Sequence, residues 1–366
     1  MNLMYIYDRK FQGLGAPLVA EPFADQAYGP QMIFDPIRTK DLTDAIQAVK
    51  KTLKLKDQQR LEKVAFTIAK LGTGEDPVKY AGVKMNDMFF SASLLKLTLL
   101  YASFELVSRV NNLAPSFLPG GSPTAFLANV QHVFGPSIAS AVPSIPDGEW
   151  RKVKFDATLV PTRGGSGVYK VKLSSQHLSD LNAIVANQLQ DWAARNCMRR
   201  LGYSYVNGAL AAGGFFDPKS KKGIWYANDL GGGWKQFYVP VATNGKSSAA
   251  MTTLAMARLL TAMHRGTLVD QASSQEMMGI MSRGGSWLSL SASANSLSFT
   301  SMGAKVGHHP SADAKVSSVK SEGAFLNRNG VPFVAVWQNY PDAIPNVVGD
   351  VINVYRVIDE VVKKWP

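Results

Sequence analysis

The chain has one cysteine, Cys197, and no run of 18 apolar residues in its 366-residue length. A single cysteine excludes an internal disulfide, and the small and apolar residues around it favour a core position over a nucleophile. Without a long apolar run there is no candidate transmembrane helix. The first ten residues also lack the basic-then-apolar plan of a secretory signal peptide.

Charged residues are scarce at 18% of the chain, yet their balance is strongly basic, with a formal net charge of +12. The lysines and arginines are dispersed, and no basic cluster carries the interleaved aromatic residues of a nucleic-acid-binding motif. We therefore expect no nucleic-acid partner, whereas attraction to an anionic surface is consistent with the charge. With 46% hydrophobic residues, the chain can bury one large core or two moderate ones.

The most informative motif is a serine followed one helical turn later by a lysine, Ser93 and Lys96. This spacing places the hydroxyl and the amine on one helix face. A partly desolvated lysine has a lowered pKa and can accept the serine proton, which makes the hydroxyl a nucleophile. The tetrad alone is weak, because a second copy spans residues 317–320. The alternative is that Ser93 caps a helix and Lys96 is solvated.

The setting of Ser93 strengthens the motif. Residues 64–69 and 78–83 read as two strands around a Gly/Pro turn, which predicts a β-hairpin. The chain then runs through a Phe-rich segment into an apolar helix, residues 94–107, that begins beside the serine. Ser93 is therefore expected at a helix N-terminus, where free N–H groups and the helix dipole favour developing negative charge.

The rest of the sequence predicts an α+β organisation with a discontinuous sheet domain. Residues 1–40 lack periodicity and are expected to form an extended arm, followed by a helix capped by Thr39 or Asp41. Residues 93–234 are expected to form a mainly helical lobe. Three further strands (297–303, 316–326 and 331–337) and a terminal helix (350–365) would complete a sheet domain from residues 41–92 and 235–366. The prediction is a five-stranded antiparallel sheet with the first and last helices on one face, and Ser93 at the seam between lobes.

This layout resembles the serine β-lactamases and penicillin-binding proteins, class A β-lactamases in particular, over about residues 41–366. The resemblance implies a Ser93 nucleophile with Lys96 as its base. It also implies an oxyanion hole made by the Ser93 amide and one amide of the final hairpin. Members usually act outside the inner membrane, which implies a periplasmic or extracellular location if a signal segment was removed and a cytoplasmic one otherwise.

The family also carries a Lys-Thr/Ser-Gly element on a strand beside the serine. Lys305-Val306-Gly307 is the candidate here, at the end of a predicted strand. By resemblance, Lys305 would neutralise an anionic group of a small-molecule or peptide-like substrate, and Gly307 would let the substrate backbone lie against the strand. Because Val306 has no hydroxyl, His308 or His309 would have to take over that contact. The alternative is that these adjacent histidines are simply exposed in a Pro-bounded loop.

A second family element, Ser-x-Asn, has no clear counterpart. One alignment places Leu189 at the serine and Asp191 at the asparagine. Another uses Tyr205 and Asn207, which match the Tyr-x-Asn of class C enzymes, in which the tyrosine is the base; residues 226–228 match the same pattern. The alternative is that each Tyr-x-Asn belongs to a structural turn with core aromatics.

Class A enzymes activate the deacylating water with a glutamate, but no glutamate occurs between Trp150 and Gln275. Asp217 and Asp229 are the remaining acids of the corresponding loop. Without such a base, an acyl-enzyme would form and persist, which is penicillin-binding behaviour. No His/Cys/Asp cluster has ligand spacing, so neither a metal nor a cofactor is predicted.

Two functions therefore remain open. One is a serine hydrolase or acyltransferase that acts on an amide or ester through a Ser93 acyl-enzyme. The other is a binding protein that has kept the β-lactamase fold and lost the chemistry, which the missing Ser-x-Asn serine, the absent glutamate and Val306 favour. The position of a second base, Tyr205 or Asp191, separates the two.

Overall fold

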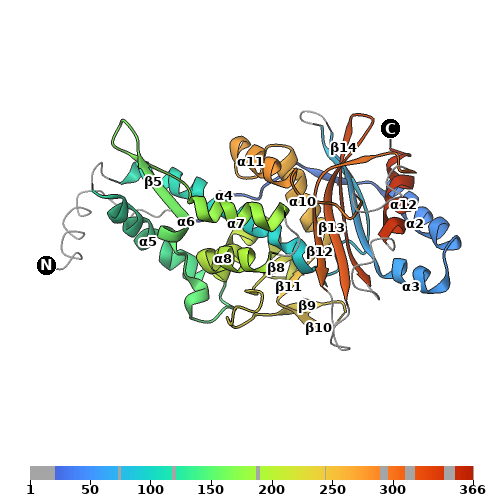
Figure 1. Cartoon of the computed structure of the whole chain (residues 1–366), viewed down its shortest axis with the longest axis horizontal. Helices are drawn as coiled ribbons and strands as arrows, with labels where there is room; N and C mark the ends of the chain where they lie inside the picture. The colour runs from blue at the N-terminus through green and yellow to red at the C-terminus, as the bar shows by residue number, and fades with distance from the viewer. Residues whose placement is uncertain are drawn as a thin grey trace.

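The computed structural model describes residues 21–72, 76–117, 121–186, 190–243, 245–288, 296–309, 318–341 and 351–365. In this part of the chain a sheet covered by helices on both faces adjoins a mainly helical region (Figure 1). The first half of the predicted arm (residues 1–20), Leu189 and Ser317 lie outside the described residues. The assignment of the two regions to separate domains stays a prediction.

The main sheet has six strands in the order β1-β3-β2-β14-β13-β12. They are β1 (Met32–Phe34), β2 (Ala65–Lys70), β3 (Val78–Val83), β12 (Thr300–His309), β13 (Val319–Arg328) and β14 (Val331–Pro341). The neighbours from β3 to β12 pair antiparallel, as the sequence predicted. The additional strand β1 runs parallel to β3, inside the predicted arm. With only three residues, β1 is too short to show a detectable period.

Helices cover both faces of this sheet (Figure 1). They are α2 (Pro36–Lys51), α3 (Leu55–Lys63) and α12 (Ile352–Val362) on one side, and α10 (Thr253–His264) and α11 (Gln271–Met281) on the other. The predicted packing of the first and last helices on one face is confirmed, since α2 and α12 contact each other there. On the other face, the hydroxyls of Thr67 and Thr253 are 2.8 Å apart and tie α10 to β2.

The first helix begins earlier than the sequence analysis predicted. Asp35 is its N-cap, and its Oδ1 accepts a hydrogen bond from the Arg38 N–H at 3.0 Å, with Pro36 in the first turn. Thr39 and Asp41, the predicted caps, lie inside the helix. Asp41 instead pairs with Arg38 at 2.7 Å.

The helical region is built around α4 (Leu97–Leu113), whose residues from Leu97 to Leu106 are all buried. Its other helices are α5 (Pro123–Ser140), α6 (Phe155–Thr158), α7 (Ser175–Ala186), α8 (Asp191–Leu201) and α9 (Tyr203–Ala212). β5 (Leu159–Arg163) and β6 (Tyr169–Leu173) form a ribbon, and β9 (Val239–Val241) pairs with β10 (Gly245–Ser247). A small sheet contains β4 (Phe89–Phe90), β11 (Ala249–Met251), β8 (Lys222–Tyr226) and β7 (Phe216–Asp217). No helix in the described ranges has the length and apolar character needed to cross a bilayer.

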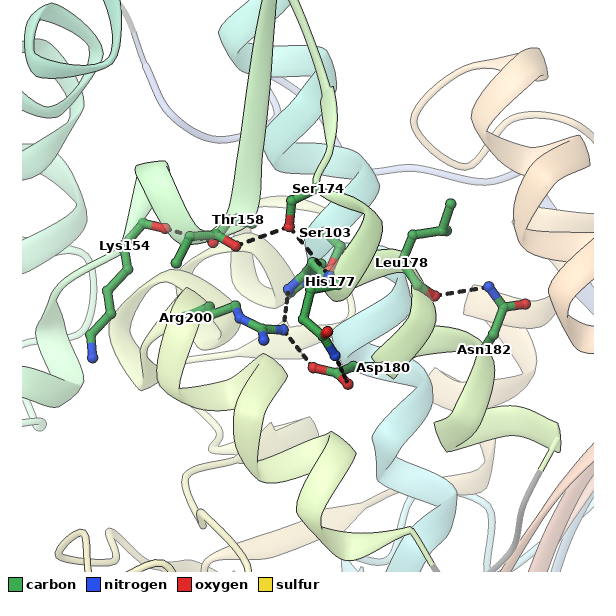
Figure 2. A network of polar contacts seen from close by, with 11 residues as sticks. Ser103, Lys154, Thr158, Ser174, His177, Leu178, Asp180, Asn182 and Arg200 are labelled. Atoms are coloured by element: carbon green, nitrogen blue, oxygen red, sulfur yellow. Dashed lines mark hydrogen bonds and ion pairs between the residues drawn. The ribbon is translucent and has the colours of Figure 1, made fainter. Parts of the chain in front are cut away.

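A buried polar network joins three helices of this region (Figure 2). Ser103 of α4 lies 2.8 Å from His177 Nε2, and Arg200 of α8 donates to Asp180 Oδ2 of α7 at 2.6 Å. The Ser103 hydroxyl donates to the Leu99 carbonyl at 2.6 Å, and His177 Nδ1 faces Arg200, not a carboxylate. The serine and histidine are fully buried, so this group is a structural tie and not a catalytic triad.

The network makes the stability of the fold pH-dependent. Burial and the charge of Arg200 lower the pKa of His177 to about 3. In the unfolded chain His177 has an ordinary pKa of about 6.5. At pH values between this pKa and that of the folded protein, His177 is protonated only in the unfolded chain, so acid favours unfolding. From pH 6.5 to pH 5 we expect His177 to remove about 2 kcal/mol from the free energy of unfolding.

Urea titrations of wild-type protein and His177→Gln at the two pH values measure this effect. The variant should lose about 2 kcal/mol less than the wild type on acidification. His132→Gln, a change at an exposed histidine of α5, should behave like the wild type. Equal acid sensitivity in all three proteins would contradict the assignment.

Candidate active site

A pocket of about 510 Å³ lies where the Ser93 turn, the start of α8, the loop after β8 and the end of β12 meet. Its lining includes Ser93, Asp191, Tyr226 and His309. A larger cavity, about 740 Å³, lies at the far end of the sheet, around Lys70 and Trp365. The residues that line this larger cavity include no serine, cysteine or histidine. The smaller pocket is therefore the candidate site.

The backbone before Ser93 presents its side chain to this pocket. β4 pairs with β11, and the chain then turns at Ala92, which adopts a left-handed φ of 49° that is costly for a residue with a side chain. A 3₁₀ helix (Ala92–Lys96) follows and leads into α4. In a 3₁₀ turn the side chains at i and i+3 are eclipsed, so Ser93 and Lys96 lie on one side. Ser93 thus occupies the start of a helical segment, as the sequence predicted.

Lys96 is bound to Asp191. Its side chain is only 1% exposed, and its Nζ donates to Asp191 Oδ1 at 2.5 Å. The Asp191 side chain is 60% exposed and lines the pocket together with Ser93. Among the described residues, the Ser93 hydroxyl makes no hydrogen bond to Lys96 or to any other group. The alternative of a solvated Lys96 is therefore wrong.

Lys305 is the second buried lysine of the site. It lies near the end of β12, where the sequence places it, and is 1% exposed. Its Nζ has no hydrogen-bond partner among the described residues. Burial and the nearby charge of Lys96 lower the pKa of Lys305 to about 7, against an opposing effect of Asp191.

Gly307 lets β12 approach the Ser93 turn. A Cβ at this position would lie 2.5 Å from the Ser91 carbonyl oxygen and 2.8 Å from the Leu94 nitrogen, both closer than van der Waals contact allows. The sequence analysis assigned this space to the backbone of a substrate. In the structure the backbone on either side of Ser93 fills it, so Gly307 positions the turn.

Gly307→Ala should therefore destabilise the protein by about 1–3 kcal/mol, because neither backbone group can move freely. Gly279→Ala is the matched control. Gly279 lies in α11, its Cβ would meet nothing within 4 Å, and alanine should stabilise the helix by about 0.5–1 kcal/mol. Chemical denaturation of both variants measures the difference, and equal stabilities would contradict the close approach.

Tyr205 and Asn207 lie away from the pocket. Tyr205 is fully buried in α9 and stacks on Phe23 with ring centroids 5.6 Å apart. Asn207 accepts a hydrogen bond from the Tyr226 N–H and donates to the Tyr226 carbonyl, each at 2.9 Å, and so ties α9 to β8. Neither side chain lines the pocket, so the class C-like assignment of this pair is not supported. The spacing matched, but α9 is a core helix.

The other Tyr-x-Asn match does line the pocket, through Tyr226 and Asn228. Burial and the charge of Asp191 raise the pKa of Tyr226 well above its usual value. Its phenol therefore stays protonated at neutral pH and cannot act as a base there.

The candidate deacylating acids are engaged elsewhere. Asp217 is the last residue of β7, and its Oδ1 accepts a hydrogen bond from the Lys219 N–H of the following turn at 2.9 Å. Asp229 Oδ2 accepts hydrogen bonds from Arg199 Nη2 at 3.0 Å and from the Trp234 N–H at 3.2 Å. These bonds order the loop from Asp229 to Trp234. Asp191 is the one carboxylate among the described residues that line the pocket, and Lys96 occupies it.

Sequence analysis missed the wall formed by the loop after β8 and the β9–β10 hairpin. This wall contributes Gln236, Tyr238, Lys246 and Ser248 to the pocket. The glycine run at residues 231–233 indicated a loop, but nothing local indicated that the loop folds back over Ser93. Lys246 Nζ lies 5.2 Å from the centre of the Tyr238 ring, so this wall is both aromatic and cationic.

The two histidines at the end of β12 also line the pocket. His309 packs edge-on against Phe90 at 5.3 Å, and His308 against Trp287 at 5.9 Å. Burial and the neighbouring His308 lower the pKa of His309, so its imidazole is largely neutral at pH 7. Within the described ranges, no three His, Cys, Asp or Glu side chains are grouped to hold a metal ion.

The sequence matches no protein-family model and no curated protein. The fold, however, is similar to solved structures. A variant of the last common ancestor of Gram-negative bacterial class A β-lactamases is 12% identical, with a TM-score of 0.50 over 88% of this chain and 97% of that one. The protein L2, in complex with relebactam, is 15% identical, with a TM-score of 0.50 over 87% and 99% of the two chains. PBP-A is 14% identical, with a TM-score of 0.47 over 92% and 99%.

Proposed function

We propose that this chain, a divergent form of the β-lactamase/transpeptidase-like fold, is a serine acyl hydrolase or transferase in which Ser93 forms an acyl-enzyme with an amide or ester. The observation that carries the proposal is the placement of Ser93. Its side chain lines a pocket from the first turn of a helical segment, on the side that also carries the buried Lys96. A strained residue, Ala92, fixes that placement.

The reaction would begin with attack of Ser93 Oγ on the substrate carbonyl carbon. The serine proton would pass to a lysine amine and then to the leaving group. The carbonyl oxygen, now negative, would accept hydrogen bonds from the Ser93 N–H and from an N–H of β12, the strand that contacts the Ser93 turn, in place of the final hairpin expected from the sequence. β12 is the last strand of its sheet in the described part of the chain, so its outer edge faces the Ser93 turn and not another strand.

The substrate is proposed to be a small acyl compound or peptide-like molecule with an anionic group. Lys246 is the one lysine or arginine among the described residues that line the pocket. The only carboxylate that lines it among the described residues, Asp191, is neutralised by Lys96. A site with this charge balance favours a substrate carboxylate over an ammonium group.

Labelling with a fluorophosphonate tests the nucleophile directly. Intact mass should rise by one adduct in the wild type and stay unchanged in Ser93→Ala. Ser248→Ala, which removes another serine of the same pocket, should label like the wild type. Loss of labelling in Ser248→Ala and not in Ser93→Ala would reject Ser93 as the nucleophile.

The second candidate is a binding protein that has lost catalysis. The observation that favours it is the Lys96–Asp191 ion pair, in which the expected base donates to a carboxylate and makes no hydrogen bond to Ser93. A wild type that binds penicillin by calorimetry, yet forms no adduct with either penicillin or fluorophosphonate, would support this alternative.

A further inference from the structure

Lys305 is the one described lysine at the site whose ammonium nitrogen has no partner. Its side chain is 1% exposed, and no hydrogen-bond acceptor contacts Nζ in the described part of the chain. A buried ammonium without an acceptor carries a large desolvation cost, so the neutral amine is the form that this position favours. A neutral amine has a free lone pair and can accept a proton.

Lys96 has the opposite environment. Its Nζ donates to Asp191 Oδ1 at 2.5 Å in an ion pair. Lys96 is thus a donor held by a carboxylate, and it makes no hydrogen bond to Ser93.

The backbone brings Lys305 to the Ser93 turn. Lys305 and Gly307 are two residues apart on β12, so their Cβ positions lie on the same face of the strand. Gly307 marks that face as the one that touches the turn, because its Cβ would contact Ser91 and Leu94. The Lys305 side chain accordingly points toward the Ser93 turn, where the charges of Lys96 and Asp191 act on it.

We propose that Lys305, and not Lys96, receives the Ser93 proton during acylation, while Lys96 stays in its ion pair with Asp191. This assignment rests on the proposed function of Ser93. The Ser93 O–H bond breaks as the Oγ–acyl bond forms, and the proton moves to Lys305 Nζ. The tetrahedral adduct then expels its leaving group, which takes the proton from the Lys305 ammonium. The site ends with neutral Lys305 and an ester at Ser93.

The charges that act on Lys305 fit this role. Lys96, from the 3₁₀ turn, and the burial of the site lower the pKa of Lys305 to about 7, and Asp191, from the start of α8, opposes them. About half of the amine is then free at neutral pH. The rate of acylation should therefore rise with pH through about 7 and level off above it.

Two substitutions distinguish the role of Lys96 in acylation from that of Lys305. Lys96→Arg keeps the cation for Asp191 and cannot act as a base, so it should slow acylation much less than Lys305→Met does. Lys305→Met removes the amine without leaving a buried charge, and should slow acylation about 100-fold or more, the usual contribution of a general base. Lys305→Met should also lose the rise in rate near pH 7. Thermal unfolding confirms that both variants are folded.

Rates are measured by intact mass during fluorophosphonate labelling between pH 5.5 and pH 9. A slow Lys305→Met beside a fast Lys96→Arg supports the assignment. A fast Lys305→Met, or a wild-type rate that does not change between pH 6 and pH 8, overturns it and leaves the Ser93 nucleophile standing. No Ser93 adduct in the wild type at any pH overturns both proposals.

Discussion

Asp191→Ala is expected to lower the free energy of unfolding by about 3–5 kcal/mol, whereas Lys96→Met should lower it by about 1 kcal/mol or less. The reason is the unequal exposure of the two partners. Lys96 is 1% exposed, so removal of Asp191 leaves a buried ammonium without a counter-ion, next to Lys305. The Asp191 side chain is 60% exposed, so removal of Lys96 leaves a carboxylate that water solvates.

Asp191→Asn should fall between these two, because the amide oxygen still accepts from Lys96 and only the counter-charge is lost. The double variant Lys96→Met/Asp191→Ala should recover most of the stability that Asp191→Ala loses, since no charge is left buried at position 96. Urea denaturation at pH 7 of the wild type, Asp191→Ala, Lys96→Met and the double variant completes the double-mutant cycle. Equal losses for Asp191→Ala and Lys96→Met would show that the buried lysine does not need its carboxylate.

The second large effect concerns the lifetime of the acyl-enzyme. A positioned general base accelerates such a step by about 10²–10⁴-fold, and the pocket offers no free carboxylate among its described lining residues. We therefore expect a penicillin adduct on Ser93 to persist for hours after free reagent is removed.

The lifetime is followed by intact mass after rapid desalting. Hydroxylamine should release the adduct, which would identify it as an ester. Release within minutes without hydroxylamine, with turnover of many equivalents of penicillin, would contradict the expectation. It would also show that another group in the pocket activates the water that hydrolyses the ester. Neutral His309 would be the first candidate to examine.

Much of the fold could be predicted because its determinants are local. The hairpin at residues 64–83 and the paired strands near residue 330 carry clear strand and turn signals, and the six-stranded sheet contains all of them. The misses were also local in origin. β1 is three residues long, and the Asp35-Pro36 pair, which caps α2, was absorbed into the predicted arm.

The site was predicted only in part. Spacing found Ser93 and Lys96, and alignment placed Asp191 where the structure joins it to Lys96. Spacing failed at Tyr205, because a tripeptide does not tell which helix is buried on all sides. The protonation state of Lys305 depends on burial beneath a distant turn, and no pattern within a single strand encodes that.

A peptide map of the protein after incubation with penicillin tests the role of Ser93 directly. We expect one modified peptide, with the added mass on Ser93, and none in Ser93→Ala. An unmodified wild type, or an adduct on any other residue, would contradict the claim that Ser93 is the nucleophile of this pocket.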